Sequence, residues 1–310
     1  MHKFNPFDYL FILRPLILIP SWNFLLIGSY LARGKSGFTL ELVLGLIIYT
    51  CIMGGTYILN QIMDRETDRI NRKLFLLSEG YVSVQVAYGE MICLWIVGLG
   101  LSFTLNSPFI IFVVISLMLG ILYSVPPFKL KGRPFLDTLA NSIGYGMINF
   151  AVGWLLFRGF EWHMFYRFMP YVLSIGAVFI NTTVIDMEGD AKAGEYTTAL
   201  FLGVRAATVL STLLMTAAVI LSSVLGDVVC LVPAATSLPL FLYVVFHVFI
   251  KGTVNRRVTI VSFRLPGLLF TLISAILYPA YFIVLIVVFI GMRLYYKRRF
   301  NMVYPTLTGG

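Results

Sequence analysis

Two short clusters of acidic residues, each at the end of a long apolar run, have the residue types and spacing that chemistry needs. In the first cluster, Asp64 and Asp68 are four residues apart, so both side chains would project from one face of a helix. The second cluster repeats this spacing with Asp186 and Asp190. Ionisable groups at the edge of a membrane segment are costly and by default mark a functional site. Two such pairs facing each other across a helical bundle would bind divalent metal ions, and oxygen ligands of this kind usually hold Mg²⁺ together with a substrate's phosphates.

An amide accompanies the first acidic pair. Asn60 precedes Asp64 by one helical turn and would add a neutral oxygen ligand, although it could instead bond to a neighbouring helix. In the second cluster, Asn181 precedes Asp186 by five residues and is a less faithful counterpart. A single cluster could be only a solvated helix end, but the repeated spacing favours a site for metal and diphosphate.

Basic residues near the clusters could neutralise phosphate oxygens that a metal leaves uncovered. Lys129 and Lys131 follow a pair of prolines, and alternate residues of an extended segment point the same way. Arg14 interrupts an apolar run and would face the bundle interior or reach the membrane interface. For the loop residues, the alternative is a plain topology signal. The candidate diphosphate ligands are Asn60, Lys131, Lys129, Arg72, Lys192, Arg14 and Tyr123.

Composition assigns the chain to the membrane proteins. Of its 310 residues, 59% are hydrophobic and 12% are charged, about half the charged share of a soluble domain; the mean hydropathy is +0.90. Apolar runs of about 20 residues can cross a bilayer as helices, and the alternation typical of a β-barrel is absent. The net charge of +9 calls for no nucleic-acid partner, since basic loops set the orientation of membrane proteins.

We predict a single polytopic membrane domain over residues 1–310, an all-α bundle of nine transmembrane helices with a pseudo-repeated pair of Asp-rich motifs. The last span contains Pro279 and is interpreted as one tilted or kinked helix, with two half-helices as the alternative. The predicted spans are 7–32, 40–63, 83–105, 108–123, 135–157, 168–185, 204–225, 228–250 and 267–294.

The distribution of Lys and Arg predicts the orientation. The N-terminus and the loops 64–82, 124–134, 186–203 and 251–266 hold most of the basic residues, so they should be cytoplasmic. Both acidic clusters then lie on the cytoplasmic side, and a bacterial or archaeal plasma membrane is the expected location. A basic cluster in the tail, residues 293–299, conflicts with this assignment if the chain crosses nine times.

At this point the residues resemble the UbiA superfamily of intramembrane prenyltransferases. The central Tyr-Ser-x-Pro-Pro-x-x-Leu-Lys stretch looks like the branch that includes chlorophyll synthases and homogentisate prenyltransferases. Two departures concern the first motif: Gln61 replaces an aspartate, and residues 74–80 lack the arginine and prolines usual there. The family's two acidic motifs are matched here by Asn60, Asp64 and Asp68, and by Asp186, Asp190, Gly194 and Thr197.

The resemblance implies Mg²⁺-dependent transfer of a prenyl group from a polyprenyl diphosphate to a lipophilic, typically aromatic acceptor within the membrane lipids, as in quinone or chlorophyll biosynthesis. The four aspartates and Asn60 would bind the metal, and the basic residues would stabilise the leaving diphosphate. Alternatives within the family are a terpene cyclase and transfer to a non-aromatic lipid. A non-catalytic lipid-binding protein would not need paired aspartates, and a secondary transporter would place its site near the midplane.

Overall fold

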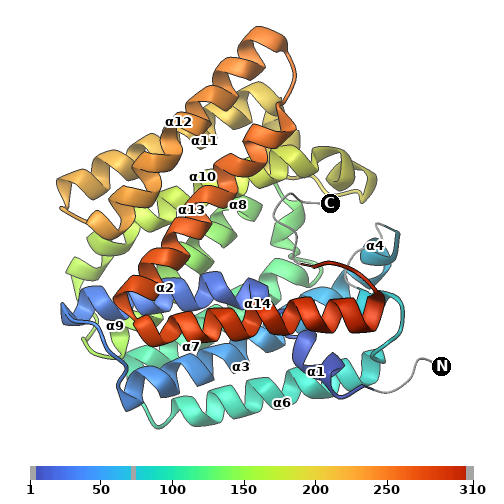
Figure 1. The fold of residues 1–310 in the computed structure, drawn as a ribbon, viewed down its shortest axis with the longest axis vertical. Helices are drawn as coiled ribbons and strands as arrows, with labels where there is room; N and C mark the ends of the chain where they lie inside the picture. Colours follow the sequence, from blue (N-terminus) through green and yellow to red (C-terminus); the bar gives the residue numbers. More distant parts are fainter. Residues whose placement is uncertain (1–4, 71–74, 305–310) are drawn as a thin grey trace.

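The structure is a computed structural model that describes residues 5–70 and 75–304. Within these ranges every regular element is helical, and the long helices pack in one layered bundle (Figure 1). The elements are α1 (Phe7–Phe11), α2 (Pro15–Arg33), α3 (Leu40–Met63), α4 (Arg65–Ile70), α5 (Phe75–Ser78), α6 (Val84–Ser102), α7 (Ser107–Ser124), η1 (Leu130–Gly132), α8 (Leu136–Asn141), η2 (Ser142–Asn149), α9 (Phe150–Leu155), α10 (Trp162–Lys192), α11 (Thr198–Val224), α12 (Val228–Lys251), α13 (Arg256–Leu277) and α14 (Pro279–Phe300).

Nine helices in the described part of the chain are long and apolar enough to cross a membrane, which confirms the predicted all-α membrane bundle. They are α2, α3, α6, α7 and the five helices from α10 to α14. Residues 136–155 form three consecutive shorter helices, α8, η2 and α9, of which η2 and α9 pack along α2. The set of nine therefore differs from the predicted spans at two places, these three shorter helices and the C-terminal end.

The C-terminal end corrects the prediction of one span over 267–294. The side chain of Asn255 caps the start of α13, so α13 begins inside the predicted loop 251–266. Helix α13 ends at Leu277, because the next residue, Tyr278, has a non-helical φ of −129° and ψ of 82°, and Pro279 then begins α14. Proline is well suited to a first helical position, because it has no N–H to leave unpaired. The apolar stretch 267–294 thus contains the end of α13, a turn at Tyr278 and most of α14, which are two separate crossings.

This extra crossing returns the chain to the end at which it began. Asp8, 2% exposed, accepts hydrogen bonds from the Tyr295 hydroxyl at 2.6 Å and from Arg299 at 2.7 Å. The Phe11 and Tyr295 rings stack with their centroids 4.0 Å apart. The basic tail cluster therefore lies beside α1, at the end of the bundle that also holds the other basic loops. The conflict in the charge distribution disappears once α13 and α14 are counted separately.

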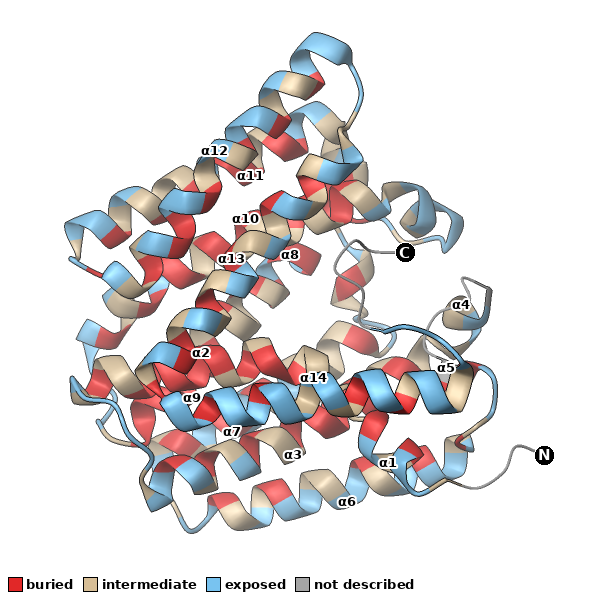
Figure 2. Ribbon diagram, viewed as in Figure 1, coloured by how far each residue is buried: buried red, intermediate tan, exposed pale blue. Residues whose placement is uncertain are grey.

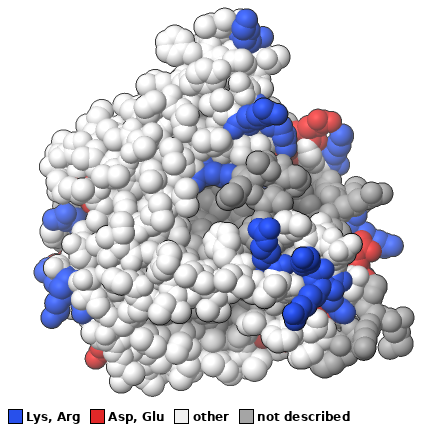
Figure 3. Space-filling model, viewed as in Figure 1, with Lys and Arg blue, Asp and Glu red and all other residues white. Residues whose placement is uncertain are grey.

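Charged side chains gather toward the two ends of the bundle, and an uncharged surface lies between them (Figure 3). In Figure 3 most Lys and Arg atoms lie toward the right-hand edge, a smaller group lies at the left, and uncharged atoms cover most of the face between them. Helices α6, α12 and α14 expose many residues, whereas α2, α3 and α9 are largely buried (Figure 2). The uncharged band is what a helical bundle presents to lipid.

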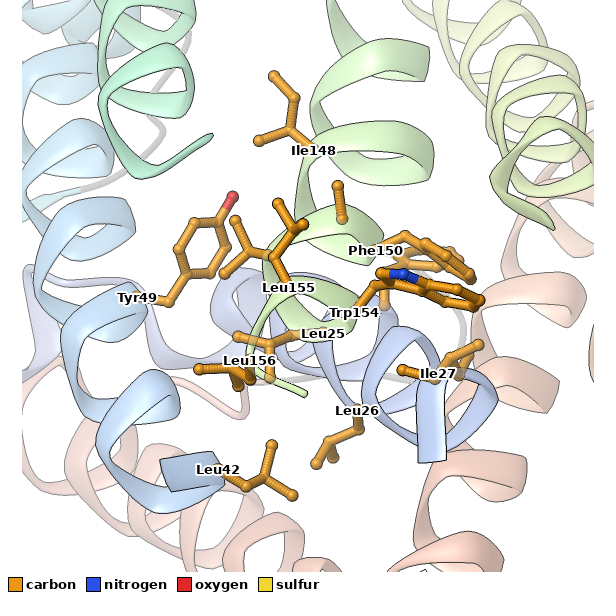
Figure 4. Packing of buried hydrophobic residues seen from close by; sticks show 14 of the residues in the cluster. Leu25, Leu26, Ile27, Leu42, Tyr49, Ile148, Phe150, Trp154, Leu155 and Leu156 are labelled. Carbon is orange, nitrogen blue, oxygen red and sulfur yellow. The ribbon is translucent and has the colours of Figure 1, made fainter. Parts of the chain in front are cut away.

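Close contact between α2 and α9 forms the centre of the core. Leu25, Phe150 and Trp154 are all less than 2% exposed and pack in one cluster (Figure 4). A Cβ atom placed on Gly153 would lie 1.9 Å from the carbonyl oxygen of Leu25, and one on Gly28 would lie 2.0 Å from that of Phe150. Glycine is therefore required on both helices, as is common where membrane helices approach closely.

Replacing Gly153 by alanine should destabilise the protein by about 1–3 kcal/mol or more, because the new methyl group meets backbone and forces the helices apart. Thermal unfolding of the detergent-solubilised protein measures the effect. Gly89 on α6 is the matched control, since a Cβ there has no atom within 4 Å. A Gly153→Ala protein as stable as Gly89→Ala would contradict this account of the helix contact.

Candidate active site

The first acidic motif lies where α3 gives way to α4. Asp64 is the C-cap residue of α3, and its N–H donates to the Asn60 carbonyl at 3.0 Å. The Asp68 N–H donates to the Asp64 carbonyl at 2.8 Å. The Asn60 amide nitrogen donates to the Ser124 hydroxyl of α7 at 3.2 Å. This bond fixes the orientation of the Asn60 amide and places its helix face against α7.

The second acidic motif lies on the last turns of α10. Helix α10 runs to residue 192, so Asp186 and Asp190 are one turn apart on the same helix. Thr197 donates to the Asp190 carboxylate at 3.4 Å, which ties the following loop to the motif. Asn181 has a structural role instead, since its buried amide donates to Ser262 at 2.9 Å and accepts from another helix.

The two motifs line one cavity of about 540 Å³ at the end of the bundle, the diphosphate cavity hereafter. In Figure 1 it lies on the right-hand side, where α4 and the end of α10 face each other. Tertiary packing thus brings together two motifs that are more than a hundred residues apart in the chain. Its polar lining includes Asn60, Asp64, Asp68, Tyr123, Lys131, Asp186, Glu188, Asp190, Lys192, Glu195 and Arg256.

Lys131 is the buried cation of this cavity. Its side chain is 8% exposed and forms an ion pair with Asp64. Lys129, by contrast, pairs with Glu195 at 3.1 Å, is 39% exposed and does not line the cavity. The expectation that both lysines point the same way is wrong, because Leu130–Gly132 form a 3₁₀ turn and Lys129 has a φ of 36°.

Buried hydrogen bonds connect the Lys131 segment to the second motif. The carboxylate of Asp137, which is fully buried, accepts bonds from the backbone N–H of Thr198 at 2.8 Å and from its hydroxyl. The Tyr196 N–H donates to the Gly132 carbonyl at 3.2 Å. Asp137 therefore holds the start of α11 against the loop that carries Lys131, which sets the distance between that lysine and the second motif.

The other predicted diphosphate ligands have different positions. Lys192 also lines the diphosphate cavity, but its side chain is 73% exposed and pairs with Glu188 at 2.7 Å. Tyr123 lines the diphosphate cavity and also a second cavity between α2, α3, α7 and η2, and its hydroxyl accepts a bond from Asn141 at 3.0 Å. Arg14 is the N-cap residue of α2; it lines this second cavity and does not line the diphosphate cavity. Arg72 lies outside the described residues.

Arg256 lines the diphosphate cavity although the sequence marked it only as a topology charge. It is the first residue of α13, and its guanidinium lies 3.5 Å from the Ile185 carbonyl, next to the second motif. The signal that could have revealed it is Asn255, a good helix cap, directly before two arginines. The loop prediction for 251–266 concealed this helix start.

The donor set of the cavity suits Mg²⁺ bridged by phosphates. Among the described residues, no three acidic, histidine or cysteine side chains converge closely enough to enclose a metal ion. The aspartates stand instead as one pair on each wall of the cavity. Magnesium is commonly bound by one or two carboxylates together with waters and substrate phosphates, and this arrangement fits such binding.

Two smaller cavities continue from the diphosphate cavity into the bundle. One of about 240 Å³ lies between α2, α10 and α13, has a mostly apolar lining and shares Phe179 and Thr182 with the diphosphate cavity. The other, of about 200 Å³, lies between α2, α3, α7 and η2 and shares Asn60 and Tyr123 with it. A polar, charged cavity thus adjoins one cavity with an almost wholly apolar lining and another whose lining mixes apolar side chains with hydroxyl and amide groups.

Comparison with known proteins agrees with this architecture. The chain is 32% identical over 169 residues to a probable homogentisate phytyltransferase 2 of Oryza sativa, covering 52% of the chain and 45% of that relative. It is 25% identical over 221 residues to digeranylgeranylglyceryl phosphate synthase of Methanosphaera stadtmanae, covering 71% and 78%. The chain therefore spans less than half the length of the plant relative and most of the archaeal one.

Solved structures share the fold. A UbiA homolog from Archaeoglobus fulgidus, bound to GPP and Mg²⁺, matches with a TM-score of 0.66 and 21% identity, covering 86% of this chain and 99% of that one. The model of the UbiA prenyltransferase family matches residues 21–259, which include both acidic motifs and every helix from α3 to α12. Sequence and fold agree, and the chain belongs to the UbiA prenyltransferase family.

Proposed function

We propose that the protein transfers a prenyl group from a prenyl diphosphate to a lipophilic acceptor within the membrane. The observation that supports this most strongly is the diphosphate cavity, in which two acidic pairs and Lys131 surround a polar space that continues into an apolar one. A secondary transporter would hold its site near the middle of the bundle, whereas these carboxylates lie at one end.

In this proposal, Asp64, Asp68, Asp186 and Asp190, with Asn60, would hold Mg²⁺, which when bound would supply positive charge that offsets the negative charge of the diphosphate. The allylic C–O bond breaks with its electron pair moving to the diphosphate oxygen. Lys131 and Arg256 lie on the cavity wall and stabilise the charge that develops there. A nucleophilic carbon or oxygen of the acceptor then bonds to the allylic carbon and loses a proton.

The apolar cavity between α2, α10 and α13 would bind the isoprenoid chain. Its lining by Phe24, Phe179, Phe263 and Phe270 keeps water away from the allylic cation. Aromatic faces also attract cations. Because the cavity shares Phe179 with the diphosphate cavity, a chain in it can remain attached to a diphosphate held by the aspartates.

The acceptor is proposed to be aromatic. The plant relative is named for homogentisate, an aromatic compound, and the archaeal relative for a glyceryl phosphate lipid. We further propose that the end carrying the site, α1 and the last turns of α14 faces the cytoplasm of a bacterial or archaeal cell, because that end has most of the basic residues.

Incubation of the purified protein with geranylgeranyl diphosphate, Mg²⁺ and a panel of acceptors tests the function. We expect release of diphosphate and a prenylated product, both abolished by EDTA and restored by Mg²⁺. A cyclised hydrocarbon formed without acceptor would instead indicate a terpene cyclase, which needs the same ionisation. Failure to release diphosphate from donors of any chain length would contradict the proposal.

A further inference from the structure

The cavity between α2, α3, α7 and η2, which we call the inner chamber, has an unusual wall. It has a volume of about 200 Å³, and one side is formed by η2, an eight-residue π-helical stretch from Ser142 to Asn149. π-Helical turns inside α-helices are rare and occur frequently at functional sites. The chamber shares Asn60 and Tyr123 with the diphosphate cavity, so a molecule inside it can reach the allylic carbon.

Asn149 has an unpaired hydrogen-bond donor in the wall of this chamber. The residue is 1% exposed and lines the chamber, and its amide nitrogen has no hydrogen-bond partner in the described structure. Buried polar groups are nearly always paired, since leaving a donor unsatisfied is costly. An unpaired donor in the wall of a cavity is therefore a position that an oxygen of a ligand could satisfy.

A chain of hydroxyl groups fixes the orientation of this amide. The Tyr49 hydroxyl donates to the Asn149 side-chain oxygen, and Ser116 lies 2.9 Å from the same hydroxyl. If Ser116 donates to Tyr49, Tyr49 can donate to Asn149, and the amide N–H₂ group is left without a protein partner in the described structure. Three helices thus hold one donor group in place before any ligand binds, which is how a specificity contact is built.

The chemistry of the chamber indicates the kind of ligand. Its polar lining consists mainly of uncharged groups, including the Tyr57 and Tyr145 hydroxyls, which lie 2.8 Å apart. Arg14, at the start of α2, is the one charged side chain among the lining residues in the described structure. A phosphate or other strong anion is usually bound by several cations or by a bidentate arginine, whereas hydroxyl or carbonyl oxygens need only neutral donors.

We infer that the inner chamber binds the acceptor and that Asn149 donates a hydrogen bond to a hydroxyl or carbonyl oxygen of an uncharged, hydroxylated aromatic acceptor. This inference rests on the proposed function and narrows it, since it makes Asn149 a specificity-determining residue.

A binding experiment and a kinetic experiment test the inference. The probes are a 2-acylphloroglucinol, its analogue that lacks one ring hydroxyl, and digeranylglyceryl phosphate as a phosphate-bearing lipid. We expect the acylphloroglucinol to raise the melting temperature of the wild-type protein, and Asn149→Leu to bind it about 10-fold more weakly. The wild type should bind the analogue about 10-fold more weakly than it binds the acylphloroglucinol. The wild type and Asn149→Leu should bind the analogue with equal affinity, because the hydrogen bond is then missing in both complexes.

The donor provides the internal control. KM for geranylgeranyl diphosphate and the release of diphosphate without acceptor should be the same in Asn149→Leu and the wild type, because neither depends on the inner chamber. If the wild type released no diphosphate, with or without acceptor, that result would instead count against the proposed function. Should Asn149→Leu fail to fold, Asn149→Ala and Tyr49→Phe test the same contact with smaller changes in volume.

Three results would overturn the inference: stabilisation by the phosphate-bearing lipid and not by the phenol, stabilisation by neither, or equal phenol affinity in Asn149→Leu and the wild type.

Discussion

Replacing Asp186 by asparagine is expected to lower kcat by about 10³-fold while the protein still folds and inserts. The substitution preserves the size of the side chain but removes one negative charge from the cavity wall that would hold Mg²⁺. Because a metal ligand acts where charge develops, the loss should appear mainly in kcat. Asp64→Asn should behave alike, since Asp64 lies on the opposite wall of the same cavity.

Steady-state release of diphosphate, measured across a Mg²⁺ titration, distinguishes a metal role from a structural one. The concentration of Mg²⁺ that gives half-maximal rate should rise in both variants, with little change in melting temperature for Asp186→Asn and a lower melting temperature for Asp64→Asn, which leaves the buried Lys131 without its ion-pair partner. Glu66→Gln is the matched control, because Glu66 is an exposed carboxylate between the first-motif aspartates and does not line the cavity. Equal losses in Glu66→Gln and Asp64→Asn would count against a metal role for the motif.

Replacing Lys131 by methionine is expected to reduce kcat by on the order of 10²-fold. Methionine has nearly the same length, so the change removes a buried charge with little loss of packing. The lysine is 8% exposed and pairs with Asp64, so its ammonium group lies beside the position proposed for the leaving diphosphate. Stabilisation of charge that develops in the transition state should affect kcat more than the KM of the donor.

Lys129→Met separates this role from general loop charge. Lys129 is two residues away, partly exposed and paired with Glu195, so its loss should alter kcat by no more than about 5-fold. Both variants change the net charge equally, and any effect of membrane orientation would therefore be shared. A larger defect in Lys129→Met than in Lys131→Met would refute the position assigned to the diphosphate.

Local patterns predicted the elements of the acidic motifs well, because the relevant physics is local. The four-residue spacing of Asp186 and Asp190 places both side chains on one helix face wherever the helix packs. The structure agrees and extends α10 through both residues. Lys129 and Lys131 show the opposite case: their relative direction depends on a 3₁₀ turn and on an ion pair with Glu195, a residue 66 positions beyond Lys129.

Hydropathy misled the prediction at the C-terminal end. Residues on both sides of Tyr278 are apolar, so hydropathy averaged over a window of residues shows no break between the end of α13 and the start of α14. The arginines near the start of α13 hid its beginning, which moved Arg256 into a predicted loop and out of the predicted site. Tertiary contacts, such as those of Asp8 with Tyr295 and Arg299, show that the tail returns to the N-terminal end.

The sequence by itself determined the membrane class, the helical composition and the acidic pairs, since hydropathy and helical periodicity are properties of a short stretch of chain. The tertiary structure decided what the pairs face. Packing joined the motifs around Lys131 and Arg256, and it left the amide nitrogen of Asn149 unpaired beside the inner chamber. Such contacts depend on which helices are neighbours, and that choice follows from close approaches such as Gly153 against Leu25, which no local pattern reveals.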